Sequence, residues 1–398
     1  MSSFAYSFRK TARKMSTMSS SDVGGILRGT DTGKYFIEYD GFLSNHLAHG
    51  VIALRRLGAS SERVQQFVDW YVPRLETSDY DKLDDRPFED LKGERTGFYT
   101  ILEEYERRLS VLNNDVDRLI KQEYPSLSLG LAGSALHGTI HLGYCYSAGH
   151  VKGVLEGLAY TFHSYRPVIS SKTDQDLAAF GSGTVDVLDV LKQVRDDREL
   201  CDSIIAGAEL EKYTSLKLGK FQRQICYLLC DRGDDIWRYV LSVMVPTDIK
   251  RPDGGVDPVK LARRLVYWSV LCYVTSEIRN QFFLLHGVTC AWSLLQIVSI
   301  LETPDAIAAC RNFTAVLVAV YIACKAPELS VPVTETTVDK ESWEALINRQ
   351  FDANRDEHCY KLLQVCRDMA TDSDKFGENA ALYYQAAQIT TDTDDFSY

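Results

Sequence analysis

The chain has no concentrated patch of lysine and arginine. Its 398 residues carry 44 basic and 55 acidic side chains, a net charge of −11. A chain with a net negative charge and no basic patch is a poor partner for nucleic acid or an anionic membrane, so neither partner is expected. A membrane-spanning helix needs about 18 or more predominantly apolar residues. The longest uncharged run, residues 280–301, is interrupted by glutamine, histidine and serine, so we expect no transmembrane helix.

Several catalytic signatures are also missing. There is no P-loop, no Gly-x-Gly-x-x-Gly fingerprint, no Gly-x-Ser-x-Gly elbow and no His-Glu-x-x-His zinc motif. These absences argue against a nucleotide-binding loop, a Rossmann site, a serine hydrolase of that type and a zinc peptidase. Glu-x-x-His is absent too, which argues against a ferritin-like di-iron centre.

The ten cysteines form no Cys-x-x-Cys pair, and the chain shows no secretory signal peptide. Free thiols in a reducing compartment fit this pattern better than a disulfide framework, so we expect a cytoplasmic protein. Residues 1–25 are rich in serine and basic residues, with no acid before Asp22. They are interpreted as a disordered N-terminus, or alternatively as a mitochondrial transit peptide.

The rest of the chain has the apolar periodicity of helices, with no strand-rich block and no repeat of fixed length. This predicts a single all-α domain over residues 26–388, followed by an acidic, disordered tail at 389–398. The longer helices are expected at 42–57, 98–124, 129–146, 151–165, 261–275, 278–300, 306–323, 343–351 and 357–369. Ser44 or Asn45 is expected to cap the first, and Pro125 to end the second.

Six of the eight histidines fall in four short segments, most of them apolar. These segments hold His46 and His49, His137 and His141, His286, and His358. A single histidine on an apolar face is usually a hydrogen-bonded core residue. Six of them buried together would repel one another on protonation, whereas a metal ion requires neutral imidazoles. We therefore predict that the fold brings the segments together around one metal in the helical core.

The spacing within each segment makes this more specific. His137 and His141 are four apart and share a helix face, so both should point to one interior position. His46, His286 and His358 are expected to converge there. An ion that leaves room for substrate takes about four or five protein ligands. His49 is therefore expected to contact a ligand without binding the metal.

Lys361 follows His358 by about one helical turn and shares its apolar stripe with Leu362 and Val365. A buried neutral lysine could react with carbon dioxide to give a carbamate ligand, or an ammonium could face bound oxygen. The alternatives are that it reaches solvent or pairs with Asp356 or Glu357. Glu156, on the helix after the central pair, would either orient a histidine or form an ordinary ion pair.

Four motifs in this order resemble those of the questin oxidase-like family. They are NHLAH at 45–49, HGTIHLGY at 137–144, FLLHGVT at 283–289, and DEH at 356–358 with Lys361. The resemblance implies an oxidase of aromatic polyketides, anthraquinones in particular, that acts with dioxygen; some members are of Baeyer–Villiger type and use NADPH. Gly138 stands where the family often has proline, and 145–147 lacks the family's acidic residue, which indicates a changed pocket wall.

The sequence therefore predicts a metal-dependent oxidoreductase, with catalytic residues unassigned. Iron suits a histidine-rich site that binds dioxygen, and zinc would instead favour hydrolysis. Tyr144, Phe282, Phe283 and Trp292 are expected to line an apolar slot for a flat aromatic substrate, although such residues more often serve as core. The alternative function is that of a helical binding or scaffold protein that keeps the fold without the chemistry.

Overall fold

The computed structural model describes residues 25–27, 29–77, 83–216, 218–329, 338–352, 354–392 and 396. The only sheet in these ranges is an antiparallel hairpin of β1 (Glu38–Tyr39) and β2 (Leu43–Ser44). The first helices are α3 (Leu47–Arg56), α4 (Ser61–Tyr71), α5 (Phe98–Val111), α6 (Val116–Ser128), α7 (His137–Ser147), α8 (Val151–His163), α9 (Asp174–Leu177) and α10 (Val187–Asp196). They are followed by α11 (Arg198–Gly207), α12 (Glu211–Thr214), α13 (Lys220–Asp231), α14 (Gly233–Ser242), α15 (Pro258–Thr275), α16 (Phe282–Ile297), α17 (Thr303–Ala323), α18 (Lys340–Phe351), α19 (Glu357–Ala370) and α20 (Ala380–Asp392). The predicted all-α class is confirmed.

Several helix predictions were wrong for local reasons. The helix expected at 129–146 begins only at His137, because the three preceding residues have left-handed φ angles of 44°, 50° and 74°. The expected helix at 98–124 is two helices, α5 and α6, because Asn113 and Asn114 adopt left-handed φ angles of 55° and 60°. Asparagine tolerates that conformation better than most residues, so it breaks the helix there. Pro125 does not end α6, which continues to Ser128.

The helix expected from residue 42 begins only at Leu47, because the preceding residues form the hairpin. His46 occupies its N-cap position, while the Asn45 side-chain oxygen accepts a hydrogen bond from the Leu47 amide at 3.0 Å. At the other end, α20 runs to Asp392 and buries Ile389, so the expected tail boundary is too early. The expectations for residues 1–24 lie outside the described residues.

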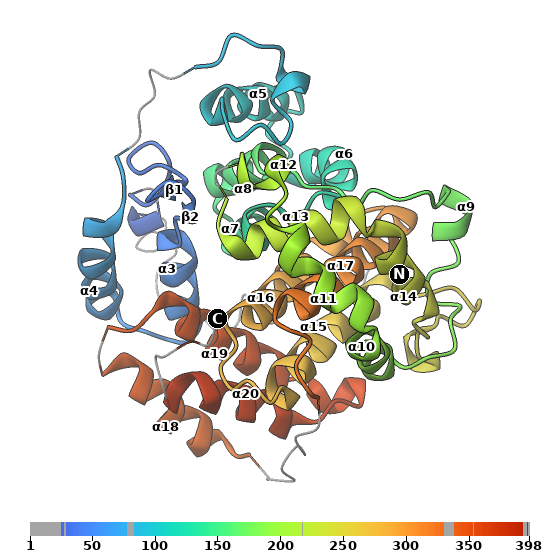
Figure 1. Ribbon diagram of the computed structural model, residues 1–398. Helices are drawn as coiled ribbons and strands as arrows, with labels where there is room; N and C mark the ends of the chain where they lie inside the picture. The colour runs from blue at the N-terminus through green and yellow to red at the C-terminus, as the bar shows by residue number, and fades with distance from the viewer. Residues whose placement is uncertain are drawn as a thin grey trace.

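The inner helices approach one another closely at glycines. Figure 1 shows α7, α15, α16 and α17 in the middle of the molecule, with α3 and α4, α5 and α6, and α18 to α20 around them. A Cβ on Gly143 of α7 would lie 2.4 Å from Ser293 Cα of α16, and one on Gly138 would lie 2.6 Å from the Thr161 amide of α8. Only glycine permits these distances, so α7 packs tightly between α8 and α16.

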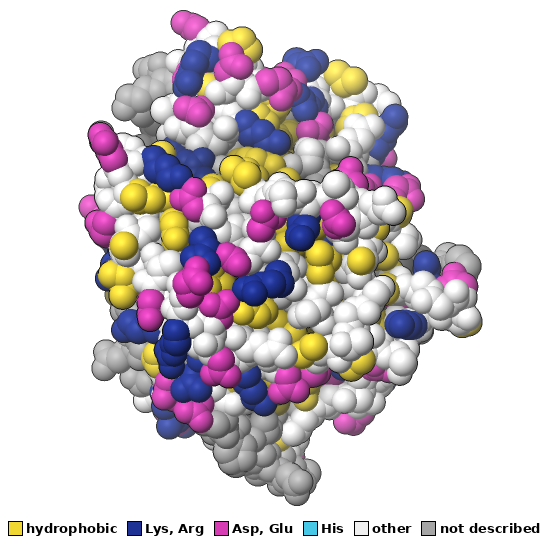
Figure 2. All heavy atoms as spheres, turned by 45° about the vertical axis from the view of Figure 1, so that its right-hand side comes forward, with side chains coloured by type: hydrophobic (Ala, Val, Ile, Leu, Met, Phe, Trp, Pro, Cys, Tyr) yellow, Lys and Arg dark blue, Asp and Glu magenta, His cyan; other side chains and the backbone are white. Residues whose placement is uncertain are grey.

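Two segments, Phe282–Ile300 and Thr303–Ala323, are long and apolar enough to cross a membrane. In this fold 78% and 83% of their most apolar windows are buried, so they serve as core helices here. Figure 2 shows acidic and basic side chains interspersed over one face of the surface.

Candidate metal centre

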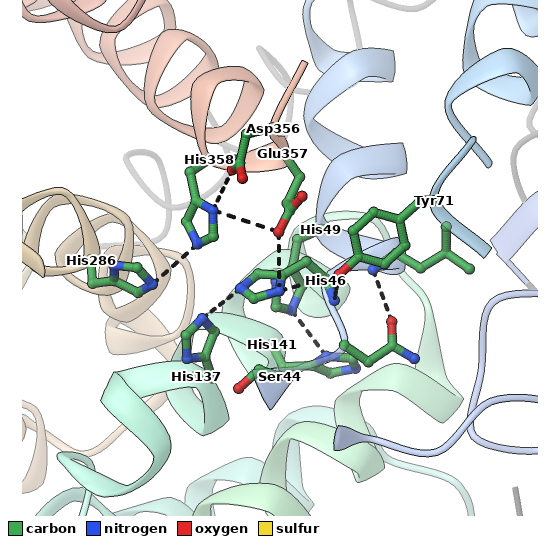
Figure 3. A network of polar contacts seen from close by, with 12 residues as sticks. Ser44, His46, His49, Tyr71, His137, His141, His286, Asp356, Glu357 and His358 are labelled. Carbon is green, nitrogen blue, oxygen red and sulfur yellow. Dashed lines mark hydrogen bonds and ion pairs between the residues drawn. The ribbon is translucent and has the colours of Figure 1, made fainter. Parts of the chain in front are cut away.

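Four histidines from four distant segments meet in the core. His46 precedes α3, His137 begins α7, His286 lies in α16 and His358 lies in the first turn of α19. One ring nitrogen from each lies within 4.8 Å of those of the others, and all four side chains are buried (Figure 3). The predicted convergence of His46, His137, His286 and His358 is therefore seen in the structure.

The rings face one another through their Nε2 atoms. His46 Nε2 lies 2.6 Å from His137 Nε2, and His286 Nε2 lies 3.2 Å from His358 Nε2. The opposite nitrogens face acceptors: His137 Nδ1 lies 2.6 Å from the Ser134 carbonyl oxygen, and His286 Nδ1 lies 2.8 Å from that of Phe282. Because a carbonyl only accepts, the Nδ1 atoms of His137 and His286 carry the proton, and the Nε2 atoms of these two rings each present a lone pair.

Converging lone pairs need a shared cation, and this is the donor set of a metal site. Burial also keeps the rings neutral, as ligands must be. It lowers the pKa of His46, His137 and His286 well below 6.5, and that of His358 to about 4. The four residues therefore fit a metal ion in both geometry and protonation.

Two carboxyl groups contact the centre from the start of α19, and the sequence reasoning did not assign them this role. Glu357 Oε1 lies 3.3 Å from His46 Nδ1 and 3.5 Å from His358 Nδ1. Asp356 Oδ1 accepts from the His358 amide at 2.9 Å and lies 2.6 Å from its Nδ1. Burial raises the pKa of Glu357 to about 8. Burial also acts to raise the pKa of Asp356, but the contacts with His358 outweigh it and hold the pKa of Asp356 at about 2. An acid one or two residues before a buried histidine is the signal that could have revealed them.

Lys361 points inward, as its stripe predicted. The side chain is fully buried, and its Nζ has no hydrogen-bond partner. Burial lowers its pKa to about 8, against the opposing effect of Glu357 and Asp356. The structure thus excludes the solvent-reaching alternative and shows no direct ion pair to either acid. A buried amine without a partner is costly, and a ligand at the centre would give it one.

His49 and His141 lie outside the group of four. His49 Nε2 lies 3.0 Å from His141 Nδ1, and His141 Nε2 lies 3.3 Å from Glu156 Oε2. The other Glu156 oxygen accepts from the amide and hydroxyl of Thr32, both at 2.7 Å. His137 and His141 are thus in different contact sets, so the expectation that both point to one position was wrong, and the six histidines form a group of four beside a pair. Glu156 contacts a histidine as anticipated, and metal binding by His141 stays a prediction.

Phe282 is the predicted aromatic residue that adjoins the group of four. Its ring centroid lies 4.6 Å from those of His286 and His358. Phe396 packs against Phe282 at 5.2 Å and lies 6.0 Å from the His358 ring, a contact from the expected tail that the sequence did not suggest. An apolar wall therefore stands directly beside the ring nitrogens.

Tyr144 and Trp292 lie deeper, with ring centroids 4.7 Å apart, and Tyr144 is 5.6 Å from the His49 ring. Both are fully buried. Phe283 stacks on Phe221 at 3.5 Å and is 6.0 Å from the His286 ring. Their predicted contact with substrate remains a prediction.

An all-α core that gathers four neutral histidines, two carboxyl groups and a lysine without a hydrogen-bond partner has the composition of a site that could hold a metal ion. The family follows from the sequence: a questin oxidase-like model matches residues 43–366, and the chain belongs to that family. A comparison with curated proteins finds no match. The matched range contains all four converging histidines and Lys361.

Proposed function

We propose that this protein is an iron-dependent oxidoreductase that uses dioxygen to oxidise an aromatic polyketide-like substrate, by ring cleavage or Baeyer–Villiger-type insertion. The observation that carries the proposal is the convergence of ring nitrogens from four buried histidines. Family membership supports an oxidase. A bound ferrous ion would supply the electrons and coordination positions that dioxygen requires. NADPH is proposed as an electron donor and the cytoplasm as the location.

The chain's own residues would hold the metal ion, orient the substrate and exclude water from the centre. Hydrogen bonds from Nδ1 to the Ser134 and Phe282 carbonyls fix two ring orientations. Phe282 offers an apolar face beside the centre on which a flat substrate ring can pack. The burial of the group excludes water, which strengthens every electrostatic interaction at the reacting atoms.

We propose that Lys361 completes the centre. Four neutral histidines leave a ferrous ion with a double positive charge, and one anionic ligand would halve it. Attack of the Lys361 amine on carbon dioxide forms a C–N bond, releases one proton and leaves a carbamate with carboxylate-like oxygens. The alternative role is an ammonium that faces bound oxygen. Its burial without a hydrogen-bond partner supports both roles.

The test begins with metal content. The full chain is expressed with iron, purified and measured by elemental analysis, and oxygen uptake is followed with a hydroxyanthraquinone, with and without NADPH. We expect about one iron per chain, since several histidines should retain metal tightly. His286→Ala should lose both metal and uptake, whereas His150→Gln, a half-buried histidine outside the group, should keep both. Iron below about a tenth of an equivalent after reconstitution would favour the scaffold function, and retained zinc with no uptake would favour a hydrolase.

A further inference from the structure

The three residues before His137 share a conformation that L-amino acids avoid. Ser134, Ala135 and Leu136 have φ angles of 44°, 50° and 74°, and none of them is glycine. Left-handed backbone is disfavoured for such residues because Cβ crowds the following carbonyl. Three in succession persist only where the surroundings hold them, and such strain gathers at functional sites.

Gln222 of α13 clamps this turn from outside. Its Oε1 accepts a hydrogen bond from the Ala135 amide at 2.7 Å, and its Nε2 donates to the Ala132 carbonyl at 3.2 Å. One buried amide group thus bonds the chain on both sides of Ser134. The partners lie about ninety residues apart in sequence, so the contact depends on the completed fold.

An ion pair between Glu38 and Arg95, largely buried, holds the same turn through the side chain of Ser134. The Ser134 hydroxyl accepts from Arg95 Nη1 at 3.1 Å and donates to Glu38 Oε1 at 3.2 Å. Arg95 Nη2 donates to Glu38 Oε2 at 2.7 Å, and the Tyr160 hydroxyl donates to Oε1 at 2.9 Å. Ser134 is therefore held in two ways. Gln222 bonds the backbone on either side of it, and the Glu38–Arg95 pair bonds its hydroxyl.

The outcome of this clamping is the direction of one carbonyl. The Ser134 oxygen lies 2.6 Å from His137 Nδ1 and accepts a hydrogen bond from its N–H. That bond leaves Nε2 unprotonated and turned toward His46 Nε2. In contrast, His286 finds its Nδ1 acceptor at Phe282, four residues back on its own helix, which ordinary helical geometry supplies.

We propose that Gln222, together with the Glu38–Arg95 pair, positions His137: by holding a left-handed turn, these residues fix the tautomer and aim of one metal ligand. The inference rests on the proposed metal centre, but not on the reaction or substrate assigned to it. Groups that orient a ligand histidine typically contribute about 10- to 100-fold to metal affinity. The hydrogen bonds of Gln222 go to Ala135, Ala132 and Cys226 and to none of the four histidines, so its effect acts through the turn.

The experiment titrates the metal-free full chain with cobalt(II), whose visible absorption reports the number and kind of ligands. Gln222→Leu removes both clamping hydrogen bonds at similar volume, and Gln224→Leu, on the same helix, is the matched control. We expect Gln222→Leu to weaken cobalt binding by about 10-fold or more, with a changed spectrum, and Gln224→Leu to bind as the wild type does. Thermal unfolding of each metal-free variant is measured in parallel.

A rescue separates positioning from simple stabilisation. Glycine adopts left-handed φ without strain, so adding Ala135→Gly to Gln222→Leu should restore part of the affinity. Unchanged cobalt affinity and spectrum in Gln222→Leu would overturn the proposal. So would equal loss in Gln224→Leu, or no recovery with Ala135→Gly, because either result would make the contact merely structural. If the wild type itself bound neither cobalt nor iron, the proposed metal centre would be wrong. That result differs from a wild type that binds metal while Gln222→Leu binds it equally well, which would contradict only the positioning role.

Discussion

Gly143→Ala tests whether the close approach of α7 and α16 sets the geometry of the centre. An alanine Cβ would lie 2.4 Å from both Cα and Cβ of Ser293 and 2.5 Å from its carbonyl oxygen. Ordinary contact begins at about 3.4 Å, and the obstructing atoms include backbone, so no side-chain rotation relieves the clash. The two helices must move apart by roughly 1 Å.

Overpacking of this kind typically costs about 1–3 kcal/mol of folding free energy. The same movement separates His137 on α7 from His286 on α16, and a 1 Å error is large beside metal–nitrogen bonds of about 2.1 Å. We therefore expect Gly143→Ala to lower the unfolding free energy by about 1–3 kcal/mol. Metal affinity should fall at least several-fold.

Gly287→Ala provides the matched control, one residue from His286 on α16. Its added Cβ meets only the Leu317 side chain, at 3.4 Å. Removing a helical glycine without a clash should leave metal affinity unchanged and stabilise the fold by up to about 1 kcal/mol. Urea unfolding of the metal-free proteins and cobalt titration measure both quantities. If Gly143→Ala matched Gly287→Ala in both, the contact between α7 and α16 would not control the site.

Three further outcomes are expected. Lys361→Ala and Lys361→Arg should each lower metal content and turnover, because neither can supply a carbamate; full metal and turnover in Lys361→Ala would pass the role to Asp356 or Glu357. The metal-free protein should lose stability as pH falls from about 6.5 to about 4, because over that range His358 binds its proton in the unfolded chain but not in the fold. The unfolding free energy should fall by up to about 1.4 kcal/mol per pH unit for each such histidine. Urea unfolding across pH measures this, and an equally steep fall of the unfolding free energy in His358→Gln would contradict the role of His358. Phe282→Ala should raise KM for a flat aromatic substrate while leaving metal content unchanged, which steady-state kinetics and elemental analysis together decide.

The sequence predicted all four histidines of the group, together with His141, because most of the histidine-bearing segments are short, apolar and part of a helix or next to one. The motif order then placed those segments in one known family. Helical periodicity likewise located most helices. One break between helices could have been predicted from neighbouring residues alone. Asn113 and Asn114 tolerate left-handed backbone, and they lie at the break between α5 and α6.

The separation of His141 from His137 could not be predicted from spacing. It depends on His49, 92 residues away, and on Glu156, which is in turn bound by Thr32 across 124 residues. Helix spacing shows which side chains share a face, but partners from other segments decide which way a ring turns. The left-handed turn before His137 also escaped prediction, since nothing in Ser134, Ala135 or Leu136 favours it locally.

The four histidines stand at positions 46, 137, 286 and 358 of 398 residues, so a bound ion would cross-link segments that are far apart in the sequence. A nascent polypeptide would lack the fourth histidine of the group until α19 has left the ribosome, so an ion could be loaded fully only after that point. Binding then closes three long loops at once and adds its free energy to the whole fold rather than to one helix. In a cell short of the metal, the expected symptom is faster turnover of the protein, because the stability that the ion contributes is lost along with its chemistry.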